Sequence, residues 1–125
     1  MKKVIGYTRI PPGGDEALLQ KQASDIELFC KNWDFKLLRI ESDIAEGVGK
    51  TGGRPEGMRA VLESIARNEV MHLVIADLVC ISDSFEGALD FRDRNFGYGP
   101  RGIWVVNSHG NLPWAFQGKE GFADV

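Results

Sequence analysis

Short apolar runs alternate along the chain with stretches whose apolar residues recur every three or four positions. Glycine, proline or polar residues flank each short run, and this arrangement is typical of strands. The pattern therefore predicts four strands, at residues 4–7, 35–40, 71–76 and 103–106.

Helical periodicity fills the three intervals between these strands. The first helix is expected to start at Asp15, the second to span residues 55–68, and the third to end at Gly97. Asp83 or Ser84 is expected to cap the third helix. The residues expected to face inward share helical spacing and are apolar: Leu19, Ala23, Ile26, Phe29, Cys30, Trp33, Met58, Val61, Leu62, Ile65, Phe85, Ala88 and Leu89.

The alternation of strands and helices predicts an α/β fold. We expect three layers, with a central, mainly parallel sheet of about four strands and helices on both faces. One domain is expected over residues 1–125, with a core at 1–106 and an aromatic tail at 107–125. The tail contains Trp114, Phe116 and Phe122. These aromatic residues either fold back onto the sheet or form an exposed patch for a partner.

The composition is that of an ordinary folded domain. Of 125 residues, 43% are hydrophobic and 26% are charged, and no apolar run is long enough for a membrane helix or a signal peptide. A cytoplasmic location is therefore expected. The net charge of −3 does not favour a DNA-wrapping protein, because phosphate neutralisation needs basic residues. Cys30 and Cys80 lack metal or redox spacing, so both are expected to be free thiols, with Cys30 in the core.

Polar residues follow the predicted strands at the ends where parallel sheets form their binding crevices. Arg9, Asp43 and Asp77 follow the first three strands, and the run Asn107-Ser108-His109 follows the fourth. An ion pair between Arg9 and Asp43 is expected in a tight crevice, because burying either charge alone is costly. The alternative is that these residues are ordinary polar strand ends that face water.

Several motifs occur in the order and spacing of one known family. The run Tyr7-Thr8-Arg9-Ile10-Pro11 resembles the Tyr-x-Arg-x-Ser motif that opens the catalytic domain of serine recombinases, the resolvase/invertase family. Gln22 matches a glutamine on the family's first helix, and Asp43 resembles the acid of its Asp-x-x-Ser-Gly loop. Arg54 resembles the arginine of an Arg-Pro pair that contacts the scissile phosphate. The resemblance covers nearly all of residues 4–106 and implies the fold of this family. The activity of the family is DNA strand cleavage and exchange.

The same resemblance implies that the chemistry is missing here. Pro11 stands in place of the nucleophilic serine, and proline has no hydroxyl to attack phosphorus. Cys80 and Asp83 replace two arginines, which removes positive charge that would stabilise a phosphoryl transition state. We therefore expect no catalytic residue and no enzymatic activity. The remnant of the active-site pocket would consist of Tyr7, Arg9, Pro11, Gln22, Asp43, Arg54, Cys80, Ser82 and Asp83.

No other residue is expected to take over the role of the missing serine. Thr8 should point to the opposite side of its strand from Tyr7 and Arg9, and Ser84 is better explained as a helix cap. The Cys80 thiol would need a neighbouring base or cation to lower its pKa. The sequence predicts no metal site and no cofactor.

The chain ends at Val125 without the long helix and the helix-turn-helix domain that follow the catalytic domain in this family. Because the chain opens on Met1 and its end looks compact, truncation is not expected. We interpret the protein as an inactive, regulatory pseudo-resolvase that acts through a protein partner or through self-association, and not at a membrane.

Two other functions stay open at this point. Weak, nonspecific binding of DNA or phosphate would use Arg9, Lys50, Arg54 and Arg59. Nucleotide binding is suggested by Gly49-Lys50-Thr51, but Ile44 stands where a P-loop requires glycine.

Overall fold

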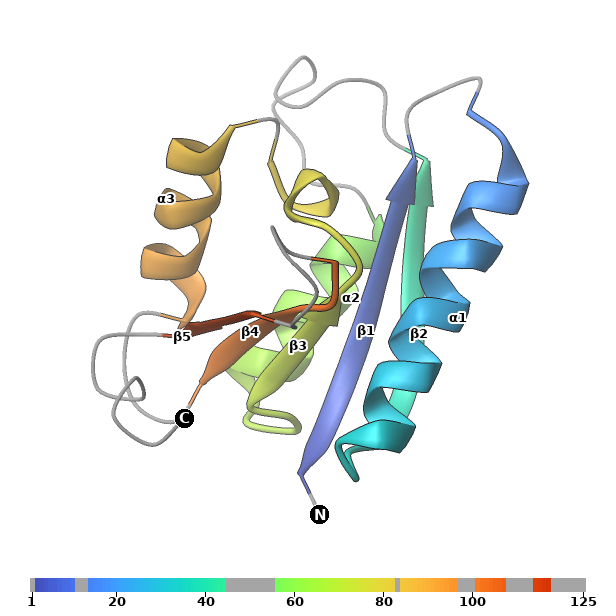
Figure 1. The fold of residues 1–125 in the computed structure, drawn as a ribbon. Coiled ribbons are helices and arrows are strands. Elements are labelled where there is room, and N and C mark those ends of the chain that lie inside the picture. Colours follow the sequence, from blue (N-terminus) through green and yellow to red (C-terminus); the bar gives the residue numbers. More distant parts are fainter. Residues whose placement is uncertain are drawn as a thin grey trace.

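The fold is an open sheet with helices on both faces (Figure 1). A computed structural model describes residues 2–10, 14–44, 56–82, 84–96 and 101–107, and the backbone of residues 114–117. The elements are β1 (Lys3–Ile10), α1 (Glu16–Asn32), β2 (Lys36–Ile44), α2 (Glu56–Ala66), β3 (His72–Ile75), the 3₁₀ turn η1 (Leu78–Cys80), α3 (Phe85–Phe96), β4 (Gly102–Val105) and β5 (Trp114–Gln117).

The five strands form one sheet in the order β2-β1-β3-β4-β5. The first four are parallel, which confirms the predicted α/β class and the mainly parallel sheet. β5 was not predicted, and it pairs antiparallel with β4, with Val105 opposite Trp114 and Gly102 opposite Gln117. This part of the tail therefore folds back onto the sheet, while Phe122 lies outside the described residues.

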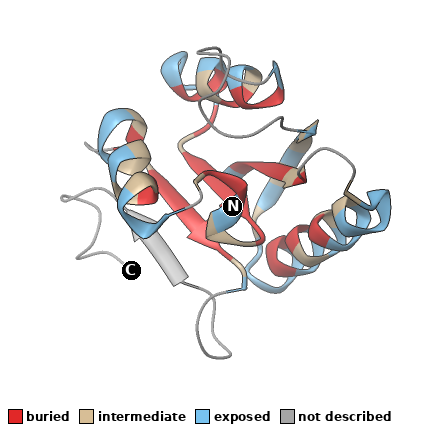
Figure 2. Cartoon of the chain, turned by 90° about the horizontal axis from the view of Figure 1, so that it is seen from above, coloured by how far each residue is buried: buried red, intermediate tan, exposed pale blue. Residues whose placement is uncertain are grey.

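Two apolar cores are packed between the sheet and its helices, one on each face. On one face, α1 packs Ile26, Phe29 and Cys30 against Val4, Val74 and Trp104 of the strands. On the other face, α2 and α3 cover a larger core with residues such as Val61 and Phe96. Figure 2 shows the buried residues of the helices turned toward the sheet and the exposed residues turned away. The burial of every residue of β3 confirms that this strand is covered on both faces.

The ends of α1 and α2 are specified locally. Asp15 caps α1, because its Oδ1 accepts a hydrogen bond from the amide of Ala17 at 2.9 Å. Two residues beyond the end of each helix stands a residue in the left-handed conformation, Asp34 or Asn68, both with φ of 58°. In each case the next amide reaches back to an orphan carbonyl: Phe35 N donates to Cys30 O at 2.8 Å, and Glu69 N donates to Ser64 O at 2.9 Å. After α1 this turn leads the chain into β2, and after α2 the same kind of turn leads it into β3.

Burial agrees with the predicted inward residues except at two aromatic positions. Cys30 is 3% exposed and fills the core as predicted. Phe85 is 55% exposed, so the expectation that it faces inward is wrong. Trp33 is 48% exposed because it lies one residue beyond the end of α1, where the helical stripe no longer continues. Among the described residues, no helix is both long and apolar enough to cross a membrane.

Candidate functional site

The carboxyl ends of β1, β2 and β3 meet at one edge of the sheet, which we call the carboxyl edge. The chain leaves β1 through α1 toward β2 and then crosses through α2 to β3, on the other side of β1. Such a reversal of strand order is where α/β folds place their binding sites. Five residues that the sequence assigned to the pocket are described and lie here together: Tyr7, Arg9, Gln22, Asp43 and Cys80.

Four other residues of the predicted sites lie outside the described part of the chain. They are Pro11, Lys50, Arg54 and Asp83, so the expectations for their positions stay predictions. Arg59 is described and exposed on α2, and Ser82 lies just before α3.

Asp43, in β2, is the most heavily bonded side chain of the carboxyl edge. Its Oδ1 accepts a hydrogen bond from the amide of Gly57 at 2.8 Å, and its Oδ2 accepts one from the amide of Met58 at 2.8 Å. These amides belong to the first turn of α2, where donors have no partner within the helix. Asp43 is therefore a helix cap supplied by a neighbouring strand.

The third donor to Asp43 is the hydroxyl of Tyr7, at 2.6 Å from Oδ2. Tyr7 is fully buried, and this burial, reinforced by the nearby carboxylate, raises the pKa of its phenol above the ordinary value. Tyr7 thus remains a hydrogen-bond donor at neutral pH. Its role in the described structure is to hold β1 to β2 and to the start of α2.

The predicted ion pair between Arg9 and Asp43 is wrong. Opposite each other in the β1–β2 register, the two residues make no ion pair, because the Asp43 carboxylate is turned to Tyr7 and α2. The Arg9 side chain is half-buried instead near Tyr7 and Cys80, and its positive charge opposes the rise in the pKa of both groups.

Gln22 interrupts the apolar stripe of α1 because it pairs with the backbone of β1. Its Nε2 donates to the carbonyl of Arg9 at 3.1 Å, and its Oε1 accepts from the amide of Arg9 at 3.0 Å. β3 ends at Ile75, opposite Tyr7, so no strand is available to bond Arg9 on this side. The amide of Gln22 therefore takes the place of a strand partner, which explains its burial at 4% exposure.

Cys80 lies at the end of η1 and is completely buried. Its Sγ donates a weak hydrogen bond to Oε1 of Gln22 at 3.6 Å. Burial raises the pKa of the Cys80 thiol, and the nearby Arg9 charge does not offset this effect. A buried thiol with a raised pKa is a poor nucleophile, which supports the prediction that Cys80 is inert.

The hydroxyl groups near this edge also have structural partners. Thr8 lies on the opposite side of β1 from Tyr7, as predicted, and shares a hydrogen bond of 2.6 Å with the hydroxyl of Ser42. Ser84 caps α3, as predicted, by accepting from the amide of Gly87 at 3.0 Å. Ser82 accepts from the amide of Ser84 at 3.2 Å.

A second polar cluster joins the ends of β3 and β4 to α1. Asn107 donates to Oδ2 of Asp25 at 3.0 Å, and Lys21 forms an ion pair with the same oxygen at 2.9 Å. Burial alone would raise the pKa of Asp25, but these two partners outweigh it and hold the pKa below its usual value. Burial, with repulsion from Asp25, raises the pKa of Asp77. The sequence pointed to Asp77 and Asn107, whereas Asp25 was missed because nothing along the chain links it to a residue 82 positions away.

The described part of the carboxyl edge is thus built from groups that hold the fold together. The Asp43 carboxylate caps a helix, the Gln22 amide completes a strand, and the Cys80 thiol is buried. The hydroxyls bond one another, the backbone or the Asp43 carboxylate. Within the described residues, no group of three or more histidine, cysteine or acidic side chains is arranged to hold a metal ion.

A scan of the sequence against protein-family models gives no match, and a search of curated proteins gives none either. The fold, in contrast, matches solved structures. The N-terminal catalytic domain of TP901-1 integrase superposes with a TM-score of 0.71 at 17% identity, covering 85% of this chain and 78% of that one. A serine recombinase from Sulfolobus solfataricus superposes with a TM-score of 0.62 at 21% identity, covering 99% of this chain and 76% of that one.

A third structure supports the same assignment. The C-terminal catalytic domain of ISC1926 TnpA, an IS607-like serine recombinase, matches with a TM-score of 0.66 at 17% identity, over 85% of this chain and 70% of that one. The motif resemblance found in the sequence and the superposition of the folds agree. The chain therefore has the fold of a serine recombinase catalytic domain.

Proposed function

We propose that this protein is a catalytically inactive, serine-recombinase-like protein that acts by binding another protein chain. The observation that carries the proposal is Cys80. The resemblance implies an arginine at this position, but the residue here is a neutral thiol, fully buried against Gln22. A phosphoryl transition state needs cations at such positions, and Cys80 supplies none.

The nucleophile position supports the same conclusion from the sequence. Pro11 has no hydroxyl, and each hydroxyl described near the carboxyl edge has a hydrogen-bond partner: Tyr7, Thr8, Ser42, Ser82 and Ser84. A serine or threonine becomes a nucleophile only when a base or a lowered pKa activates it. None of these hydroxyls has a histidine or lysine partner among the described residues, so none is activated.

Incubation with supercoiled plasmid tests the missing activity. The native chain and Pro11→Ser should both leave the plasmid supercoiled and give no covalent protein–DNA adduct on a denaturing gel. A hydroxyl at position 11 alone is not expected to suffice, because the cations implied at positions 80 and 83 are still absent.

Pro11→Ala is the matched control, because it removes the proline without adding a hydroxyl. Nicking by Pro11→Ser that is absent from Pro11→Ala would overturn the account of the pocket. A covalent adduct with the native chain would overturn the proposal as a whole.

The binding of a protein partner needs a separate test. Sedimentation velocity of the full chain at increasing concentration should show reversible self-association, or an affinity-tagged chain should retain a host protein that binds again after purification. A chain that stays monomeric and retains no such protein would contradict this part of the proposal.

Weak DNA binding at the carboxyl edge is the second candidate function. Arg9 and Arg59 favour it, because neither makes an ion pair with another described residue. Duplex affinity should then fall steeply with salt, weaken in Arg59→Glu, and rise in Asp83→Arg if that side chain lies near the phosphates. Equal affinity of both variants and the native chain at low salt would exclude this candidate.

A further inference from the structure

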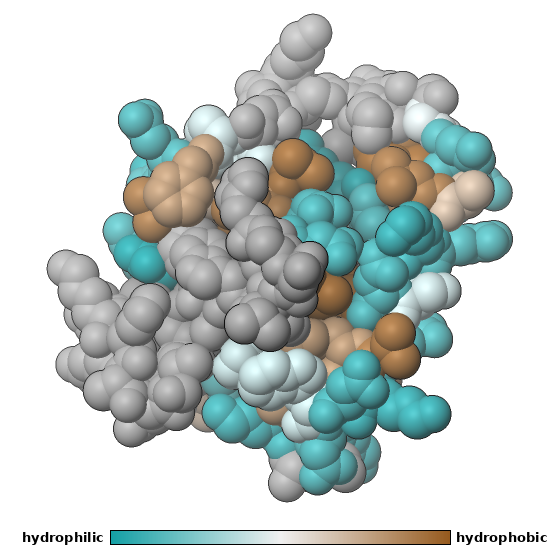
Figure 3. All heavy atoms as spheres, viewed as in Figure 1, coloured by the Kyte–Doolittle hydropathy of each residue, from teal (hydrophilic) through white to brown (hydrophobic). Residues whose placement is uncertain are grey.

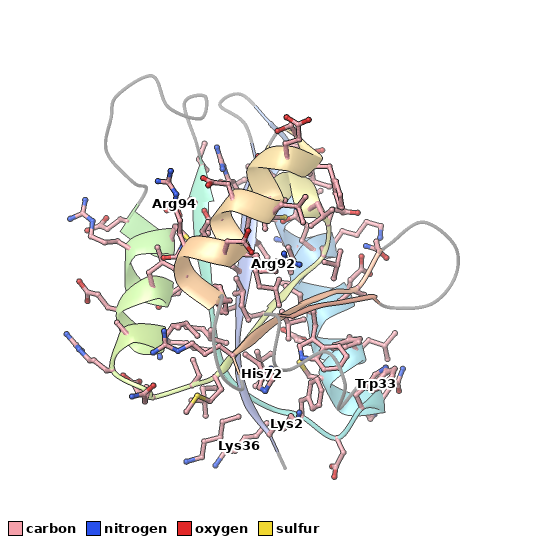
Figure 4. All side chains as sticks on the ribbon, turned by 90° about the vertical axis from the view of Figure 1, so that its left-hand side faces the viewer. Lys2, Trp33, Lys36, His72, Arg92 and Arg94 are labelled. Atoms are coloured by element: carbon pink, nitrogen blue, oxygen red, sulfur yellow. The ribbon has the colours of Figure 1, made fainter. Side chains whose placement is uncertain are left out.

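The opposite edge of the sheet, where the strands begin, carries a group of lysines next to an exposed tryptophan. Lys2 precedes β1, Lys3 starts β1 and Lys36 starts β2. Lys31 lies in the last turn of α1, and Trp33 follows the helix directly. All five side chains are exposed. We call this group the lysine–tryptophan edge. Figure 4 shows Lys36, Lys2 and Trp33 in this order along the lower end of the molecule.

Backbone pairing fixes the spacing of the lysines. Lys3 lies directly opposite Lys36 in the β1–β2 register, and the amide of Lys36 donates to the carbonyl of Lys2 at 2.7 Å. Successive strand residues point to opposite faces, so Lys3 and Lys36 share the α2 face, while Lys2 lies toward the α1 face near His72. The positive charges therefore lie on both faces of the sheet at this edge, and Lys2 is on the face that carries α1 and Trp33.

The charge of this edge is not neutralised by the rest of the described structure. Residues 2–3 and 31–36 contain four lysines and one acid, Asp34, which gives a formal charge of +3 in a chain of −3. None of the four lysines forms an ion pair with another described residue, whereas Lys21 and Arg67 do. Like charges placed directly opposite on paired strands destabilise a sheet. A bound polyanion would relieve the repulsion between Lys3 and Lys36.

Trp33 offers a rigid aromatic surface beside these charges. Its ring stacks on Phe29 at 5.6 Å between centroids with 28° between planes, and it lies 5.8 Å from the ring of Trp104. These contacts hold the side chain in place while 48% of it stays exposed. An aromatic ring already held by packing loses little entropy when a planar ligand stacks on it.

We propose that the lysine–tryptophan edge binds single-stranded nucleic acid, with phosphates along the lysines and a base stacked on Trp33. Exposed bases and a charged backbone match the two features of this edge, whereas the bases of a duplex are already stacked on one another. A membrane fits less well. The packing of Trp33 restricts insertion, and the face over α1 is mostly hydrophilic with separate apolar side chains (Figure 3).

The proposal is independent of the carboxyl edge, which lies at the other end of the strands. Fluorescence anisotropy of a labelled oligothymidylate with the full chain, measured over a range of salt concentrations, tests it. Lys2→Glu/Lys36→Glu should reduce the slope of log affinity against log salt by at least about 1.4, that is, about 0.7 for each lost phosphate contact. Arg94→Glu is the matched control, because it reverses an exposed charge on α3, apart from the lysine–tryptophan edge (Figure 4), and should leave the affinity unchanged.

The role of Trp33 has its own measurement. Trp33→Leu should weaken oligothymidylate binding by roughly 5- to 150-fold, which corresponds to the loss of one stacked base. Trp33→Phe keeps an aromatic face and should retain most of the affinity. Circular dichroism and thermal unfolding identify any variant that fails to fold. If Trp33→Leu does not fold, Trp33→Phe provides the comparison. Quenching of tryptophan fluorescence by the bound oligothymidylate should then be smaller in Trp33→Phe than in the native chain.

Several outcomes would overturn the proposal. One is an equal loss of affinity in Arg94→Glu and in the double lysine variant, which would show that binding follows the overall charge and not this edge. Another is tighter binding of duplex than of oligothymidylate. Retention by vesicles rich in anionic lipid, with no binding of the oligonucleotide, would assign the edge to membranes. No binding of any polyanion would leave the lysines as ordinary solvated charges.

Discussion

Asp43 shows how one side chain can serve three parts of the structure. It accepts from Tyr7 of β1 and from two amides of α2, at 2.6 to 2.8 Å. Asp43→Ala should lower the free energy of unfolding by about 2–4 kcal/mol, because it removes a helix cap and leaves the Tyr7 hydroxyl buried without its acceptor. Urea unfolding followed by circular dichroism measures the loss.

Tyr7→Phe separates these two contributions. In the Asp43→Ala background it removes the orphaned hydroxyl, so the double variant should be more stable than the sum of the single losses predicts, by about 0.5–3 kcal/mol. Strict additivity of the two losses would show that the Tyr7 hydroxyl finds another partner.

His72 gives the fold a dependence on pH. The side chain is 6% exposed, and its Nδ1 accepts from Nε1 of Trp104 at 3.3 Å. Burial, assisted by the charge of Lys2, lowers the pKa of His72 to about 4 from 6.5. The unfolded chain therefore takes up a proton near pH 6.5 that the folded chain resists. Stability is fully present above this pH and should fall by about 3 kcal/mol as the pH decreases toward about 4.

The measurement is the free energy of unfolding between these two pH values, in the native chain and in His72→Asn. The amide oxygen of asparagine can accept from the indole but does not titrate, so this variant should lose most of the pH dependence in this window. An equal slope in both proteins would assign the dependence to other groups.

At the scale of single elements, α2 and α3 each need a glycine near their first turn, for different reasons. A Cβ on Gly57 would lie 2.7 Å from the backbone oxygen of Ser42 and 2.9 Å from Oδ2 of Asp43. Gly57→Ala should therefore destabilise the fold by about 1–3 kcal/mol, although alanine favours helices, because a strand carbonyl cannot move aside. Thermal or urea unfolding measures this loss.

A Cβ on Gly87 would instead overlap the side-chain oxygen of Ser82, which can rotate or be removed. Gly87→Ala should be tolerated in a Ser82→Ala background, where helix propensity should contribute up to about 1 kcal/mol. Equal losses at both glycines in that background would contradict this distinction.

The same scale shows what the sequence could predict. Apolar periodicity placed four strands and three helices correctly, because each pattern lies within one element. The strand at β5 escaped prediction because residues 114–117 offer too short a run among glycines, and only pairing with β4 defines it. The end of β2 was also missed, since residues 41–44 are mostly polar and are held by pairing with β1.

For the site, the sequence predicted the location but not the contacts. Arg9, Gln22 and Asp43 do meet at the carboxyl edge, because strand ends in a parallel sheet lie together. The partners of Asp43 were not predictable from the chain, since Tyr7 is 36 positions away and the amides of α2 carry no sequence signal.

At the scale of the whole molecule, the packing around Cys80 bears on the proposed lack of recombinase activity. Cys80 is 0% exposed and lies in the core shared by β1, β3, α2 and α3. Cys80→Arg would place a guanidinium there beside the positive charge of Arg9. An unpaired buried charge should cost at least about 3 kcal/mol. Cys80→Ala is the size control and should cost about 1–2 kcal/mol.

Chemical unfolding of both variants compares these costs. A larger cost for Cys80→Arg would mean that the fold itself excludes the arginine implied by the resemblance, because β1, α1 and η1 close around a small neutral side chain through Gln22. If Cys80→Arg unfolds at the same urea concentration as the native chain, the site still has room and solvent for a cation. The proposed inactivity would then depend on the residues at positions 11, 80 and 83 and not on a lack of space. Pro11→Ser combined with Cys80→Arg and Asp83→Arg would become the decisive test for strand cleavage.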